Sequence, residues 1–178
     1  TEAKSYEREF FDWDGLNVAK DKIIFQLINT EQNKEMLKNM PHREFQDLSV
    51  IYRIVVRITD YGYDSVPITN HVAESMGASE EELFSLAYKN TQRIFPMEIE
   101  SMEKAMSRML LDDGMPEELV EEMAKQMAAE MEEDHVEMYV ISNDVKQNGA
   151  TGMLYEKKLY EFAEKIGSDF YILPSSIH

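Results

Sequence analysis

A run of carboxylates is the strongest chemical feature of the sequence. Between residues 112 and 137, eleven of 26 residues are Asp or Glu and only Lys125 is basic, so the segment carries a net charge of about −10. Carboxylates at this density attract basic protein surfaces and repel phosphate groups. We therefore predict that the segment binds a basic protein through these carboxylates: Glu117, Glu118, Glu121, Glu122, Glu130, Glu132, Glu133 and Asp134.

The same segment is predicted to form a helix, because its apolar residues recur at every fourth position. Leu119, Met123, Met127 and Met131 define one apolar face, and Pro116 stands where a helix tolerates proline in its first turn. Two interpretations remain open. The helix is either an ordinary solvated surface helix packed on the protein's own core, or a surface made to meet a basic partner.

Metal-binding residues are not recognisable in the pattern. The four histidines, at positions 42, 71, 135 and 178, lack the spacing of a helical metal site, and the chain has no cysteine to ligate zinc or an iron–sulfur cluster. Asn143, Asp144, Asn148 and Gly149 offer oxygen atoms of the kind that calcium prefers, but their spacing is not that of an EF-hand. We interpret this loop as a turn and predict neither a metal nor a cofactor.

Catalytic residues are equally hard to find. The absence of cysteine excludes a thiolate nucleophile. Ser175, Ser176 and His178 cluster near the end of the chain, but no Gly-x-Ser-x-Gly motif presents a serine as a nucleophile. We therefore predict a protein that is not an enzyme, and the role of this cluster stays open.

Composition limits the partners. The chain has 18 basic and 35 acidic residues, a net charge of −17, which predicts no direct binding to nucleic acid or to an anionic membrane. It has neither an apolar run long enough to span a bilayer nor a basic and apolar signal peptide, so we expect a cytoplasmic protein. The oligomeric state is left open.

The predicted fold class is α+β, in a single compact domain over residues 1–178. Apolar residues make up 43% of the sequence, which suits a globular core. The domain is divided into an arm (1–13), helices (14–40), a first α+β unit (48–95), a methionine-rich acidic helical arm (96–137) and a second α+β unit (138–178).

The first α+β unit has clear start and stop signals. Residues 50–58 alternate as a buried strand that exposes Arg53 and Arg57, and Pro67 predicts an edge strand after the turn. Gly77 ends a short helix in a left-handed conformation. Ser79 and Glu82 then form a capping box that opens the next helix.

The second α+β unit repeats this order more weakly. We expect strands at residues 138–142 and 150–155, a helix with Leu159, Phe162 and Ile166 on one face, and a last strand at 169–173. Strand, turn, strand, helix and glycine occur in both units. The repetition predicts two related units that share one mixed sheet, with the acidic helical arm between them.

Two stretches resemble a known family. They are ITNHVAESMGASEEELFSLAYKNTQRIFPMEIESME at residues 68–103, and MYVISND with EKIGSDFYILPSSIH at residues 138–144 and 164–178. These resemble domain of unknown function 5688, a family of gut-bacterial proteins. The resemblance runs from about Asp12 to His178 without the acidic segment, and Met76 stands where the family tends to have tryptophan. It implies a fold but no mechanism.

A small, acidic, cysteine-free chain of this kind also looks like the anti-CRISPR proteins of phages and mobile elements. That resemblance implies an inhibitor of the RNA-guided DNA nuclease of type II systems. The inhibitor would bind the nuclease in complex with its guide RNA. Such a nuclease holds nucleic acid in positively charged channels. Eleven carboxylates along a helix of 26 residues give roughly one charge per 3.5 Å, close to the ~3.4 Å per phosphate of one DNA strand.

We therefore expect a non-catalytic inhibitor that blocks DNA binding or cleavage by the nuclease. Two alternatives belong to other classes of function. One is a bacterial housekeeping domain or enzyme whose site the sequence does not display. The other is a self-associating module that uses the methionine face.

Overall fold

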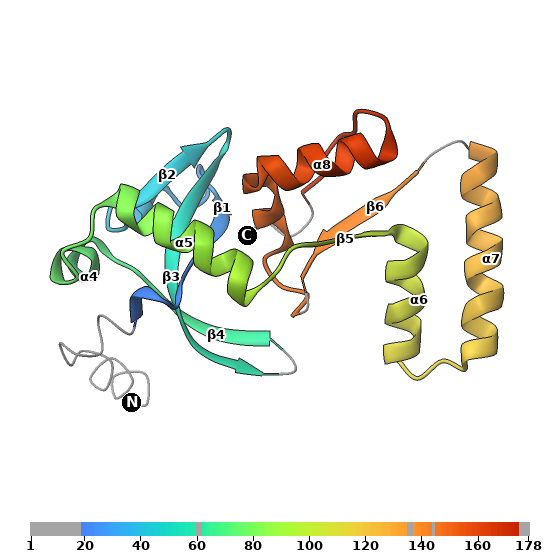
Figure 1. The fold of residues 1–178 in the computed structure, drawn as a ribbon. Helices are drawn as coiled ribbons and strands as arrows, with labels where there is room; N and C mark the ends of the chain where they lie inside the picture. Colours follow the sequence, from blue (N-terminus) through green and yellow to red (C-terminus); the bar gives the residue numbers. More distant parts are fainter. Residues whose placement is uncertain (1–18, 60–61, 135–136, 144, 175–178) are drawn as a thin grey trace. The chain divides into compact units, whose positions relative to one another are not determined.

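The chain forms two compact units. The computed structural model describes residues 19–59, 62–134, 137–143 and 145–174, with side chains in the long acidic helix described as far as Gln126. Thr1–Pro96 and Asn143–His178 form the first unit, here called the sheet unit, and Met97–Ser142 form the second, here called the hairpin unit (Figure 1). The predicted α+β class is confirmed, but the expected single domain is divided between these two units.

An antiparallel sheet is the framework of the sheet unit. Its central strand is β3 (Leu48–Thr59), which pairs with β1 (Ile23–Asn29) along one edge. Along the other edge, β3 pairs first with β2 (His42–Phe45) and then with β4 (Gly62–Pro67). The strand predicted at residues 50–58 is thus confirmed as the element around which the sheet is built, and Pro67 lies on an edge strand as expected.

Strand β1 replaces a helix that the sequence predicted within residues 14–40. Its sequence, IIFQLIN, is buried on both faces: Ile23, Ile24, Phe25, Leu27 and Ile28 are all at most 4% exposed. A strand buried on both faces loses the alternation that identifies strands, and its apolar spacing also fits a helix. The sequence also predicts a short helix from about Glu31 to Asn39 that buries Met36 and Leu37. This helix is present as α3 (Lys34–Leu37), but only Leu37 is buried and Met36 is exposed.

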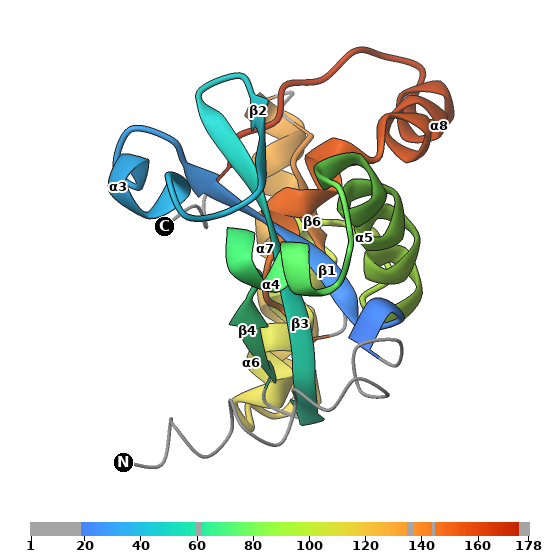
Figure 2. The same cartoon turned by 90° about the vertical axis from the view of Figure 1, so that its left-hand side faces the viewer.

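Helix α5 (Glu80–Ile94) packs against β1, and α3 lies on the opposite side of that strand (Figure 2). The predicted capping box is present: Glu82 N donates to Ser79 Oγ (3.2 Å), and Ser79 N donates to the Glu82 carboxylate (2.9 Å). The bond from Ser79 N, together with one that the Ser79 hydroxyl donates to the same carboxylate, lowers the pKa of Glu82. The helix therefore begins where local chemistry alone required it to begin.

The outer edge of β1 is covered by α5. Phe25 N donates to Thr91 Oγ1 (3.2 Å), and Asn90 Nδ2 donates to the carbonyl of Lys20 (2.7 Å). Edge strands left open invite pairing with other chains. Thr91 thus occupies an N–H group of β1 that would otherwise be available to another strand, and Asn90 binds the chain just before the strand begins.

The two arginines of the β3–β4 hairpin differ in exposure and in their partners. Arg57 is exposed as predicted and pairs with Asp64 at 2.6 Å. Arg53, predicted to be exposed, is half-buried: it donates to Ser65 Oγ at 2.7 Å and to the Ser65 carbonyl at 2.8 Å. After the hairpin, α4 (Asn70–Ser75) leads into Gly77, whose φ of +59° confirms the left-handed glycine.

The predicted second α+β unit is largely wrong. A 3-10 helix, η1 (Gly149–Leu154), occupies the place of the expected second strand, and residues 169–173 have no strand. Helix α8 (Glu156–Ile166) is confirmed and ends at Gly167, with φ +70°. The expected first strand, β6 (Tyr139–Ser142), belongs to the hairpin unit, where its partner is β5 (Glu98–Ser101). The two predicted units therefore do not share a mixed sheet.

The hairpin unit consists of the β5–β6 ribbon and two helices that pack side by side (Figure 1). Helix α6 (Met102–Asp112) begins later than predicted, because the residues after Pro96 form β5 first. Gly114, at φ +84°, breaks the chain before α7 (Glu117–Asp134), the predicted acidic helix. Within the described part of the chain, none of the helices has the length and apolar character needed to cross a bilayer.

Candidate functional site

Negative charge is concentrated in the hairpin unit. Its 46 residues contain fourteen carboxylates and three basic residues, a net charge of −11, whereas the remaining 132 residues carry a net charge of −6. Three basic residues can neutralise at most three of the fourteen carboxylates one for one. The unit therefore presents an excess of negative charge whatever its side chains do locally.

Helix α7 carries all eight of the carboxylates predicted to bind a partner. Glu117, Glu118, Glu121 and Glu122 are exposed. The other four, Glu130, Glu132, Glu133 and Asp134, belong to the second half of α7, and their side chains lie outside the described residues. The described half of the predicted surface thus faces solvent, where a partner protein can reach it.

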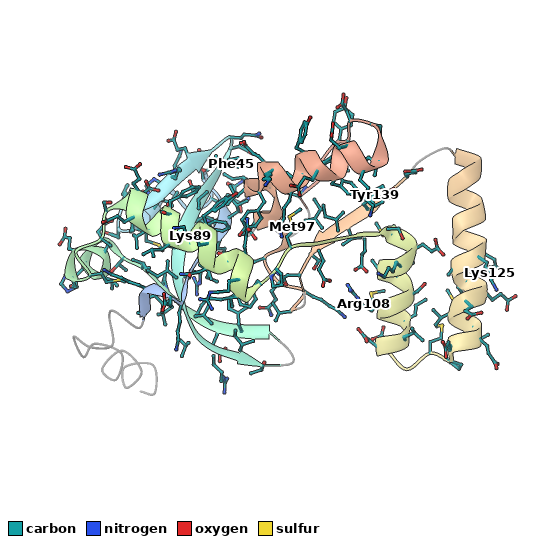
Figure 3. The ribbon with its side chains drawn as sticks, viewed as in Figure 1. Phe45, Lys89, Met97, Arg108, Lys125 and Tyr139 are labelled. Carbon is teal, nitrogen blue, oxygen red and sulfur yellow. The ribbon has the colours of Figure 1, made fainter. Side chains whose placement is uncertain are left out.

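Two of the three basic residues are paired within the unit. Arg108 on α6 lies 2.5 Å from Glu100 and 3.7 Å from Glu98, both on β5. The Glu100 side chain is only 8% exposed, so Arg108 balances a carboxylate that the fold has nearly buried. Lys125 lies 3.7 Å from Glu121, on the side of α7 that faces away from α6 (Figure 3).

The spacing of the exposed carboxylates destabilises the isolated helix. Glu117 and Glu121, like Glu118 and Glu122, are four residues apart, and like charges at this spacing cost about 0.2–0.5 kcal/mol per pair. In the first turn, Glu117 and Glu118 are favoured by the helix dipole, whereas the last turn has no basic residue to complement it. A cationic partner would relieve the repulsion between the like-charged pairs.

The apolar face of α7 is only partly buried in the half of the helix whose side chains the structure describes. Val120 is 3% exposed, whereas Leu119 and Met123 are 51% and 45% exposed. Successive residues of a helix are about 100° apart around its axis. Leu119 therefore lies about 100° from Val120 and Met123 about 60° from it, both in the same direction of rotation. The helix therefore packs through Val120, and half of each neighbouring large side chain remains in contact with water.

Little of the hairpin unit is fully buried. Among its described residues, Val120 alone is buried. Three further large apolar side chains of the unit, Met109, Leu111 and Met138, are 52%, 46% and 46% exposed. A two-stranded ribbon with a pair of helices has little apolar area to bury, so a partner surface would add to its core.

Other candidate chemistry is dispersed. His42 Nδ1 bonds the carbonyl of Met40 (2.9 Å), and His71 is exposed at the start of α4. No three His, Asp or Glu side chains gather as a metal-ligand set among the residues that the structure describes. His135, Ser175, Ser176 and His178 lie outside that part of the chain.

The loop after β6 is a turn, as predicted. The Asn143 side chain accepts from Gln147 N (3.3 Å) and donates to the Gln147 carbonyl (2.6 Å), which closes the loop on itself. Asn148 adopts a left-handed conformation and donates to the Tyr63 hydroxyl at 2.6 Å. Asp144 lies outside the described residues. These amides serve the turn and its attachment to the sheet.

One polar cluster in the sheet unit could not be recognised from the sequence. Arg43 on β2 makes a two-pronged ion pair with Glu80 on α5, at 3.1 and 2.9 Å, and its guanidinium lies 4.0 Å above the Phe84 ring. Tyr52 on β3 donates its hydroxyl to the same carboxylate. The hydrogen bond with Glu80 raises the pKa of Arg43, and burial raises that of Tyr52.

This cluster is structural, because each of its members finds a partner inside it. It ties two strands to the first turn of α5 by charge-assisted hydrogen bonds. Its members are 28 and 37 residues apart in sequence, and no short motif connects them. Only the pairing of β2 with β3 and the position of α5 bring them together.

Fold and surface together define a class: an α+β protein of two compact units, one of which is an acidic helical hairpin with little buried side chain among its described residues. The chain belongs to DUF5688, a family of unknown function, whose model matches residues 2–178. The match spans the acidic segment, which the resemblance drawn from the sequence had left out. Neither the curated proteins nor the solved structures that were compared contain a match.

Proposed function

We propose that this chain is a non-catalytic binding protein whose helix α7 docks on a basic surface of a partner protein. The observation that carries the proposal is the excess of carboxylates in the hairpin unit, where fourteen face three basic residues. Opposite charge across an interface steers encounter and fixes orientation. The exposed first half of α7 supports this role, because its carboxylates are accessible.

The dimensions of α7 suit a groove. Its 18 residues extend for about 27 Å at ~1.5 Å per residue. A rod of this length with carboxylates along it imitates the charge of a nucleic-acid strand without its bases. A protein that normally holds nucleic acid in a basic channel is therefore the kind of partner that this helix fits best.

The particular partner that we propose is the RNA-guided DNA nuclease of a type II CRISPR system, which the chain would inhibit by blocking DNA binding or cleavage. This finer proposal rests on the anti-CRISPR resemblance and on the positively charged channels that such nucleases use. A chain of net charge −17 would compete with nucleic acid for the channel and would not bind nucleic acid itself.

The test is pull-down with the guide-loaded nuclease, together with a DNA-cleavage assay. Changing Glu118, Glu121, Glu122 and Glu130 to Lys shifts the charge by eight units and leaves Leu119 and Met123 in place. Binding and inhibition should fall by at least about tenfold, because each close like-charge contact costs on the order of a kcal/mol. Circular dichroism must show a folded variant.

A matched control separates the site from the overall charge. Changing Glu74, Glu81, Glu164 and Asp169 to Lys gives the same eight-unit shift on exposed positions of the sheet unit. This variant should inhibit as the unaltered chain does. If the folded α7 variant inhibits equally well, α7 is not the binding surface. If the unaltered chain does not bind the nuclease, the finer proposal is wrong.

A further inference from the structure

We infer that the element which α7 recognises on its partner is a basic amphipathic helix, anchored on Leu119 and Met123. This inference rests on the proposed function and names the chemistry of the partner at the same surface. It begins from two large apolar side chains that the hairpin unit leaves about half exposed, although Val120 beside them is buried.

A short repeat in α7 places these anchors. Residues 117–124 read Glu-Glu-Leu-Val followed by Glu-Glu-Met-Ala, so each turn of the helix presents two carboxylates, a large apolar residue and a small one. Four residues correspond to about 6 Å along the axis, slightly more than one turn. The two anchors therefore stand one above the other, with Glu118 and Glu122 each one residue before an anchor.

A partner helix matches this arrangement in both spacing and charge. A helix with apolar residues three or four apart can pack its own ridge against Leu119 and Met123. Lysines or arginines on either side of that ridge would meet the exposed carboxylates of α7, as charges flanking an apolar seam do in coiled coils. The backbone N–H and C=O groups of α7 are hydrogen-bonded within the helix, so a partner must be recognised through side chains.

Charge argues against a second copy of the chain as the occupant. The hairpin unit carries a net charge of −11, and pairing two α7 helices would bring like charges together along the seam. An extended basic peptide is also a poor match, because strand addition requires an open sheet edge and the anchors lie on a helix. A basic helix satisfies the apolar and the charged residues at once.

The test uses the full chain and two synthetic peptides of lysine and leucine, each about as long as α7. One peptide has its leucines at helical spacing on one face; the other has the same composition in scrambled order. Fluorescence anisotropy at physiological salt should show the amphipathic peptide binding at least about tenfold more tightly than the scrambled one. Its helicity should rise on binding.

Replacing both Leu119 and Met123 with Ala should abolish this preference and leave the weak binding of the scrambled peptide unchanged. The matched control replaces Met109 and Leu111, which are as exposed but lie on α6, and should retain the preference. All four positions are exposed, and alanine suits a helix, so both variants should fold.

The outcomes are distinguishable. Equal binding of the two peptides would overturn the inference but leave the proposed function intact, since charge alone would then account for recognition. Failure of both peptides to bind would count against the proposed function itself. A dimer in light scattering that the Leu119 and Met123 double variant dissociates would assign the surface to a second copy and overturn the inference.

Discussion

The sheet unit and the hairpin unit use burial and charge in opposite ways. In the sheet unit, β1 and β3 bury apolar residues on both faces, and Phe25, Tyr52 and Leu83 are completely enclosed. In the hairpin unit, the described residues include one buried side chain, Val120. The first unit has the core of an independently stable domain, whereas the second displays most of its surface, both apolar and charged.

The two units also differ in how their charged side chains are paired. Arg43 and Glu80 meet in a two-pronged pair that Tyr52 completes, so the charge in this part of the sheet unit is satisfied internally. On α7, Lys125 approaches Glu121 while the neighbouring Glu122 follows the like-charged Glu118 by four residues. The stabilising core thus lies in the sheet unit, and the function that we propose for α7 would place recognition in the hairpin unit.

The largest expected effect tests whether the core really lies in the sheet unit. Phe25→Ala should destabilise the chain by about 3–5 kcal/mol, because the ring is fully buried and contacts α5 and Tyr155. Val120→Ala should cost only about 1–2 kcal/mol, the loss of two buried carbon atoms. Denaturant unfolding measures both, and equal losses would remove the contrast between the units.

Tyr52→Phe tests the internally satisfied cluster. The lost hydrogen bond to a carboxylate should cost about 1.5–3 kcal/mol at neutral pH. Burial, together with this bond, raises the pKa of Tyr52, so the folded state favours the protonated phenol. Its contribution is complete below the ordinary tyrosine pKa of about 10 and is lost as the pH rises above it. The unfolding free energy of the variant should therefore fall less steeply above pH 10 than that of the unaltered chain.

Phe162→Ala addresses the less well packed end of the sheet unit. If the Phe162 ring were fully buried, a loss of about 3–5 kcal/mol would be expected. In the structure Phe162 is half-buried and meets the Phe170 ring edge-on at 5.4 Å. We expect a loss of about 1–2 kcal/mol in denaturant unfolding. A loss as large as that of Phe25→Ala would mean that α8 belongs to the main core.

The smallest expected effect has the opposite sign. Glu122→Gln removes one like-charge pair from α7 and keeps the first-turn carboxylates and the Glu121–Lys125 pair. The helix should gain about 0.2–0.5 kcal/mol, seen as slower amide hydrogen exchange in α7. The same substitution at Glu74 in the sheet unit should change exchange there very little. If amide exchange became slower after Glu74→Gln but not after Glu122→Gln, like-charge repulsion would not distinguish α7 from the sheet unit.

Local signals predicted local structure well. The capping box at Ser79 and Glu82, the left-handed Gly77 and the acidic helix with Pro116 before it depend on neighbours within a few residues, and all three are present. Such features are decided by short-range sterics and hydrogen bonds. They appear whatever the rest of the chain does.

Longer-range predictions failed where one pattern fits two structures. The stretch containing β1 has apolar spacing that suits a helix or a doubly buried strand, and only its pairing with β3 distinguishes them. Residues 150–155 suggested a strand, but Gly149 and Gly152 lie in η1, and β6 pairs with β5 instead. Strand partners are chosen by tertiary packing, which a single sequence does not specify.

For the candidate site, the sequence by itself determined the charge and the helix. Eleven carboxylates within 26 residues and a four-residue apolar period need no tertiary information to be recognised. The tertiary structure decided which apolar residues that helix buries: α7 packs against α6, and Val120 is buried whereas Leu119 and Met123 stay half exposed. Periodicity identifies an apolar face, but only the position and size of the neighbouring element determine how much of that face is removed from water.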